Sequence, residues 1–152
     1  MYLFEIIEHE EKYKAKIFTT SINHSSFHWH YDYELILILK GSLIVNVGSR
    51  NMLLDSQKII LLNSQEVHEL KRTQENNLCL FIQINKAMIG NLRNDNKSYY
   101  FYLNSNDKNH IPKNGYEAYI YIAACIGIES QKKELCNIYR IKSLVYMLIA
   151  DL

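Results

Sequence analysis

The sequence predicts a mainly β fold, a β-barrel followed by a C-terminal antiparallel pair of α-helices. Two observations predict it. From residue 2 to about residue 103 the apolar runs are short, rich in Ile, Leu, Val and Tyr, and separated by polar clusters, which is typical of an all-β sandwich or barrel. From about Pro112 onward the apolar residues recur every three or four positions, which is typical of helices. We therefore divide the chain into a barrel domain at 1–110 and a helix pair at 111–152.

The strands are predicted from apolar runs that lie between turn-forming residues. Lys40-Gly41-Ser42 is one such break, and similar polar clusters recur through the first part of the chain. The run at 35–39 is apolar on both faces, which predicts a strand covered on one side by the barrel interior and on the other by the helix pair. The predicted strands are 2–7, 14–20, 34–39, 43–47, 52–54, 59–62, 67–71, 78–84 and 98–103.

Two apolar stripes predict the helices, and a polar break at 130–133 predicts that they pack antiparallel. The second stripe is wider than one neighbouring helix needs, so we expect it to form both core and a homodimer interface, with core alone as the alternative. It reaches Leu152 without a stop signal, so we expect a further domain beyond. The first stripe is Tyr116, Tyr119, Ile122, Ala123 and Ile126, and the second runs from Leu135 through Ile138 to Ile149, with Ile141, Val145, Leu148 and Leu152 as the expected interface.

Composition excludes several classes of protein. The chain has 152 residues, 48% of them apolar and 22% charged, which suits one globular domain and excludes disorder of the whole chain. A net charge of +1 gives no sequence-wide attraction for nucleic acid or an anionic membrane. The three cysteines form no CxxC pair, which argues against a disulfide framework and a zinc knuckle. Without a signal peptide or a membrane-spanning run, we expect a cytoplasmic protein with no membrane partner.

The most informative stretch contains His28, His30 and Glu34. Residues two and four apart on a strand project to the same side, so these three side chains are expected to converge. His68 opens a later strand, which a compact barrel can bring beside them. Two imidazoles and a carboxylate that converge on one point suit a first-row divalent metal such as Zn, Ni, Fe or Mn. The alternative is that the four side chains only form hydrogen bonds with one another and with nearby backbone.

The remaining aromatic and histidine residues of this region are expected to be structural. Trp29, Tyr31 and Tyr33 alternate with the converging residues and are expected to pack on the other side. The other histidines, His9, His24 and His110, lie in polar surroundings and are expected to be solvated.

This stretch resembles the first motif of the cupin superfamily, which reads His-x-His, three or four residues, Glu, six residues and Gly. His28, His30, Glu34 and Gly41 meet every spacing. The second cupin motif has a Pro and a Gly before its His, and the segment that ends in His68 lacks both. The Gly expected five residues before the first His is also replaced, by Asn23.

A closer resemblance is to the N-terminal sensor domains of AraC-type transcription regulators. Their second motif looks like an apolar strand followed by Asn-Pro-Asn-Glu-Val-His, and residues 59–68 fit it with Ser64 in place of Pro. The resemblance covers about residues 25–152. It implies a cupin-like β-barrel, also called a double-stranded β-helix, a small-molecule effector bound at His28, His30, Glu34 and His68, and a homodimer formed through the helix pair.

The same resemblance implies that the chain is not an enzyme and needs no cofactor, a divalent metal at the four residues being the alternative. DNA would be bound only through a helix-turn-helix domain outside this chain, because no basic helix here suits the major groove. The rival hypothesis is a small metal-dependent cupin enzyme, such as a dioxygenase or a sugar isomerase. That enzyme would also need a general base, and the sequence places no extra carboxylate for that role.

Overall fold

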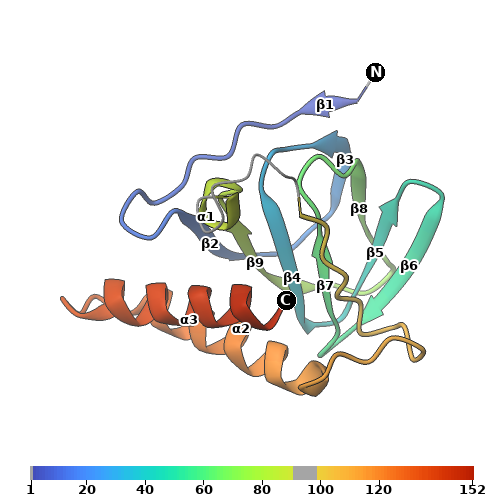
Figure 1. Cartoon of the computed structure of the whole chain (residues 1–152). Coiled ribbons are helices and arrows are strands. Elements are labelled where there is room, and N and C mark those ends of the chain that lie inside the picture. Colours follow the sequence, from blue (N-terminus) through green and yellow to red (C-terminus); the bar gives the residue numbers. More distant parts are fainter. Residues whose placement is uncertain (1, 91–98) are drawn as a thin grey trace.

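The computed structural model describes residues 2–90 and 99–152. In these residues nine strands form two sheets, one with the order β1-β3-β8-β5-β6 and the other with the order β2-β9-β4-β7 (Figure 1). The elements are β1 (Leu3–Phe4), β2 (Ala15–Thr20), β3 (His24–Trp29), β4 (Tyr33–Lys40), β5 (Ser42–Val47), β6 (Arg50–Asp55), β7 (Ile59–Leu62), β8 (His68–Arg72), β9 (Leu78–Ile84), α1 (Ala87–Gly90), α2 (Gly115–Gln131) and α3 (Asn137–Asp151).

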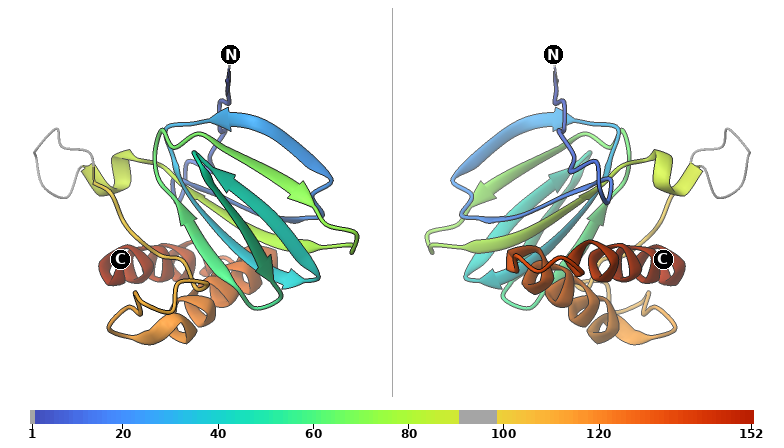
Figure 2. Two further views of the ribbon diagram at one scale, coloured as in Figure 1. Left: turned by 90° about the vertical axis from the view of Figure 1, so that its right-hand side faces the viewer. Right: turned by 90° about the vertical axis from the view of Figure 1, so that its left-hand side faces the viewer.

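The two sheets enclose a barrel interior, and α2 and α3 lie together on one side of the barrel (Figure 2). Buried aliphatic and aromatic side chains from both sheets fill the interior, among them Val45, Leu70 and Phe81. The prediction of a mainly β barrel followed by a C-terminal helix pair is confirmed.

Strand β4 shows why one run of this sequence is apolar on both faces. Leu35 and Leu37 belong to the core that the sheet shares with the helices, whereas Ile36 and Ile38 face the barrel interior. All four are buried, so the expected double cover is confirmed. Only Leu39, at the end of the run, is exposed.

The turn between β4 and β5 requires a glycine. Gly41 has a φ of +70°, in the left-handed region that residues with a Cβ avoid. A Cβ at this position would also lie 2.1 Å from the carbonyl oxygen of Asn76. The motif glycine is therefore explained by backbone geometry and close packing.

Helices α2 and α3 pack on the outer face of the sheet that contains β4, in one core with it. The Asn137 side chain donates from Nδ2 to the carbonyl oxygens of Glu129 and Lys132, which fixes the connection between the helices. No helix among the described residues is long and apolar enough to cross a membrane.

Three of the four residues expected at the dimer interface are buried in the core of their own chain. Ile141, Val145 and Leu148 are at most 3% exposed within the single chain, because they face the sheet and α2. They form core and are not available to a partner. Leu152 is half-buried and packs against the same core. Leu135, which the stripe included, precedes α3 and is 94% exposed.

Two predicted strands are also corrected. The strand expected at 2–7 is only the two-residue β1, because this exposed segment has β3 as a neighbour on one side and solvent on the other. Of the strand expected at 98–103, Ser98 lies outside the described residues and the rest is not a strand. Its backbone is tied to β7 by single bonds instead, such as that from the Leu61 N–H to the Leu103 carbonyl.

Candidate functional site

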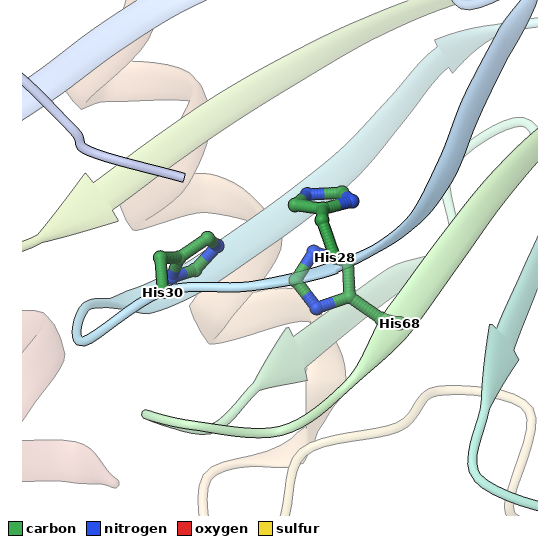
Figure 3. Close-up of side chains that lie close together, drawn as sticks. All are labelled: His28, His30 and His68. Carbon is green, nitrogen blue, oxygen red and sulfur yellow. The ribbon is translucent and has the colours of Figure 1, made fainter. Parts of the chain in front are cut away.

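Three histidines meet in the barrel interior (Figure 3). His28 lies on β3 directly opposite His68 on β8, and His30 lies in the connection from β3 to β4. One ring nitrogen of each histidine lies within 4.8 Å of the others. The structure therefore brings together the three histidines that the sequence singled out.

The reason for this convergence differs from the one predicted. His28, His30 and Glu34 do not share a strand, because β3 ends at Trp29 and β4 begins in the other sheet. The chain crosses between the sheets at His30. The turn at Asn63–Glu66 braces this crossing, since the Gln65 N–H donates to the His30 carbonyl and the Ser64 hydroxyl donates to the Tyr31 carbonyl.

Glu34 completes the cluster from the opposite sheet. Its Oε2 lies 3.4 Å from Nε2 of His30, and its Oε1 lies 3.8 Å from Nε2 of His68. Gln83 stands beside Glu34 in the register of β4 and β9 and donates from Nε2 to Glu34 Oε2 at 2.5 Å. Both side chains face the barrel interior and are at most 3% exposed.

Backbone carbonyls set the tautomer of all three histidines. The Nδ1 atom lies 2.8 Å from the Ser26 carbonyl in His28, 3.1 Å from the Asp32 carbonyl in His30 and 2.8 Å from the Glu66 carbonyl in His68. A carbonyl oxygen can only accept, so each Nδ1 carries a proton. In the neutral ring the Nε2 lone pair is then free. Such second contacts orient histidines that bind metals.

The cluster leaves buried polar atoms without partners. Nε2 of His30, Nε2 of His68 and Oε1 of Gln83 are buried and accept no hydrogen bond from the described residues. Leaving a buried acceptor unpaired costs about 1–3 kcal/mol, so such groups are normally satisfied. The two unpaired imidazole nitrogens lie beside the Glu34 carboxylate, which is an arrangement that a cation satisfies.

The electrostatics of the cluster reflect burial against mutual attraction. Burial alone would raise the pKa of Glu34. A protonated His30 ring would donate to the Glu34 carboxylate, and this contact together with the charges of protonated His68 and His30 holds the pKa below its ordinary value. Burial lowers the pKa of His68, and Glu34 offsets only part of that effect. For His30 burial also lowers the pKa, but Glu34, Asp32 and Glu5 together raise it above the ordinary value.

The donor set and its spacing fit a divalent metal. Two ligands that each lie about 2.0–2.1 Å from one metal at a tetrahedral angle are separated by about 3.3–3.4 Å. The His30–Glu34 separation of 3.4 Å has this value, and the His68–Glu34 separation of 3.8 Å is wider. Neutral imidazoles with one carboxylate suit Zn, Ni, Fe or Mn. His28, His30, Glu34 and His68 are therefore able to hold such an ion.

Comparison with known proteins identifies the barrel. Residues 16–84, slightly less than half of the chain, match the family model of the AraC-like ligand binding domain. Over these residues the chain is similar to an AraC-like ligand binding domain. The match runs through β2 to β9 and contains all four predicted site residues. The resemblance found in the sequence is confirmed.

Two solved structures are similar to part of this chain. A cupin superfamily protein from Desulfitobacterium hafniense is 16% identical, with a TM-score of 0.45 over 47% of this chain and 68% of that chain. A cupin-2 domain containing protein from Shewanella frigidimarina is 15% identical, with a TM-score of 0.43 over 51% and 82%. No curated protein matches the sequence significantly. Identities and TM-scores of this size assign no function.

Sequence reasoning missed two residues at the candidate site. Gln83 is a polar residue on the interior face of an otherwise apolar strand, and that isolated polarity was the available signal. Glu5 places Oε2 at 3.3 Å from Nε2 of His28. No motif marks Glu5, because the N-terminal segment approaches the site only through the tertiary structure. Glu5 is therefore a carboxylate near the site that the sequence did not place there.

The other aromatic and histidine predictions are partly corrected. Trp29 and Tyr31 pack outside the barrel as expected, in edge contact with each other, and Tyr33 is buried on the helix side. His24 is half-exposed and lies 2.9 Å from Glu69. His9 is not solvated, because it is largely buried and its Nε2 lies 2.8 Å from Asp32. His110 is exposed and contacts the Tyr102 ring.

Proposed function

We propose that this chain is the ligand-sensing domain of a cytoplasmic AraC-type transcription regulator and that its ligand includes a divalent metal. The observation that carries the proposal is a cluster of three histidines whose Nδ1 atoms are held by backbone carbonyls. The Nε2 atoms of His30 and His68 lie beside Glu34. The match to the AraC-like ligand binding domain supports a sensing role over a catalytic one.

In this proposal the ligand is bound inside the barrel. His28, His30, Glu34 and His68 bind the metal, and Gln83 keeps the Glu34 carboxylate in place. A bound ion would act there as a Lewis acid for a polar group of a small effector. The unpaired acceptors favour this metal-containing form over a cluster that only forms internal hydrogen bonds.

The helix pair, residues 111–152, acts in the proposal as the dimerisation part, with the barrel at 1–110 as the sensor part. The homodimer contact is the outward face of α3, where Tyr139, Tyr146 and Met147 are 72%, 50% and 49% exposed. This face replaces the buried stripe that the sequence suggested. DNA is bound through a helix-turn-helix domain outside this chain.

The metal-dependent enzyme is the second candidate, because its ligand set is the same four residues. What disfavours it is the family match, since the matched domain is described by ligand binding. If the metal-loaded chain turned over a substrate, the enzyme hypothesis would be preferred to the sensor hypothesis.

A metal-binding experiment tests the proposal. The purified chain is incubated with Zn²⁺, Ni²⁺ or Mn²⁺, desalted and analysed for metal content and melting temperature. We expect about one equivalent of bound metal. At a hundredfold excess over the Kd, binding adds about 2.7 kcal/mol, which raises the melting temperature by roughly 5–10 °C.

Two variants make this experiment specific. The double variant His28→Ala/His30→Ala should lose the metal and the rise in melting temperature. The variant His24→Ala removes a half-exposed histidine of the same strand and should behave as the parent does. A parent that retains no metal and shows no thermal shift would mean that the four residues only form hydrogen bonds.

A further inference from the structure

The N-terminal segment reaches the histidine cluster from outside the AraC-like match. β1 runs parallel to β3, with Leu3 opposite His28 and Phe4 opposite Trp29. The next residue, Glu5, donates its backbone N–H to the Trp29 carbonyl at 3.0 Å. The Phe4 ring packs on Trp29 with centroids 4.7 Å apart. These contacts hold the Glu5 side chain at the height of His28.

The Glu5 carboxylate faces the metal-binding nitrogen of His28. Its Oε2 lies 3.3 Å from Nε2, while Nδ1 on the other side of the ring is held by the Ser26 carbonyl. A separation of this size is compatible with two ligands of a single ion, whose metal–ligand bonds are about 2.0–2.1 Å long. It equals, within 0.1 Å, the separation between His30 and Glu34.

The charge of the cluster calls for a second carboxylate. Three neutral histidines and the Glu34 carboxylate would leave a divalent ion with one uncompensated positive charge. The four side chains are at most 7% exposed, and an uncompensated buried charge is costly. A second carboxylate at the cluster makes it neutral. In the described part of the chain Glu5 is the carboxylate paired with His28, whereas Asp32 is paired with His9.

We propose that Glu5 is a further ligand of the metal held by His28, His30, Glu34 and His68, so that metal binding fixes the N-terminal segment on β3. This inference rests on the metal centre of the proposed function. It adds a ligand from a segment outside the family match, and it links occupation of the site to the order of residues 2–5.

A Zn²⁺ titration of three forms of the chain tests the role of Glu5. Zn²⁺ affinity is measured by competition with a chromophoric chelator for the parent, for Glu5→Gln and for the control Glu8→Gln. Glu8 lies in the same segment and is exposed, so its replacement removes the same charge without touching the cluster. We expect Glu5→Gln to weaken Zn²⁺ binding about tenfold or more, and Glu8→Gln to change it by less than twofold.

Hydrogen exchange gives a second readout that affinity alone does not supply. Saturating Zn²⁺ should slow exchange of the Glu5 backbone amide, which bonds to the Trp29 carbonyl, in the parent and in Glu8→Gln. In Glu5→Gln, at Zn²⁺ concentrations that saturate it, the exchange rate should stay at its metal-free value.

The outcomes separate this inference from the proposed function. If Glu5→Gln binds Zn²⁺ as tightly as the parent and its amide is protected equally, Glu5 is not a ligand, and the metal centre stands without it. If the parent itself binds no Zn²⁺, the metal centre and the role of Glu5 both fail.

Discussion

At the scale of single residues, the site consists of polar atoms that the fold has buried in fixed directions. Gln83 shows this most clearly, because its amide has one satisfied and one unsatisfied end. Nε2 donates to Glu34, whereas Oε1 is buried without a partner among the described residues. Cys79 is the contrasting case. Burial raises the pKa of this thiol to about 12, as expected of a structural cysteine in the core.

The Gln83–Glu34 pair yields a prediction for stability. Gln83→Leu leaves the buried Glu34 carboxylate without its amide donor and should lower the free energy of unfolding by about 1–3 kcal/mol. Replacing both partners removes the unpaired group, so Glu34→Leu/Gln83→Leu should cost less than the sum of the single variants. Urea unfolding of the metal-free chain measures all four forms. Strict additivity would show that the hydrogen bond contributes nothing.

At the scale of elements, the connection between α2 and α3 depends on charge. Glu129 lies near the C-terminus of α2, where the helix dipole disfavours a carboxylate. Lys132 at 2.5 Å and Arg140 at 3.7 Å offset this effect. The hydrogen bond from Lys132, followed by the charges of both cations, holds the pKa of Glu129 below its ordinary value of 4.5.

This pKa predicts a pH dependence of stability. A carboxyl group whose pKa is lower in the folded chain stabilises the fold above its unfolded pKa, about 4.5, and that stabilisation is lost as the pH falls through the lower folded value. The parent should therefore exceed Glu129→Gln in stability at pH 7, and the difference should shrink below pH 4.5. Thermal unfolding from pH 7 to pH 3 measures it, with the exposed Glu75→Gln as the control. A constant difference across this range would contradict the assignment.

At the scale of the whole molecule, the barrel and the helix pair share one core. Buried side chains of β4, β9, α2 and α3 form a single cluster, so the inner face of α3 is committed to its own chain. The outer face of α3 carries the exposed Tyr139, Tyr146 and Met147. A two-fold contact would cover such a face by pairing it with the same face of a second copy.

Two charged substitutions on α3 distinguish core from interface. Val145→Asp places a carboxylate at a position that is 0% exposed and should unfold the chain or lower its stability by several kcal/mol. Met147→Asp should leave the chain folded but dissociate the dimer, because like charges would meet across the two-fold axis. Sedimentation and circular dichroism of both variants measure this. A parent that is monomeric at high micromolar concentration would refute the proposed dimer.

The sequence by itself determined the strand-rich barrel and the helix pair, and it singled out four residues that the structure brings together. These features have local signatures, since apolar periodicity gives β7 at 59–62 and β9 at 78–84 with the predicted bounds, and the histidine spacing is a motif. The required glycine at position 41 is also visible locally, although its contact with Asn76 is not.

Only the tertiary structure decided how these parts meet. An apolar stripe on α3 has the same appearance whether it faces its own sheet or a second chain, so periodicity could not place Val145 in the core. Strand register alone would have put His28 and Glu34 on one strand, whereas the chain changes sheets between them. Glu5 and Gln83 join the site through contacts across 23 and 49 residues of sequence, and no local pattern encodes contacts of that range.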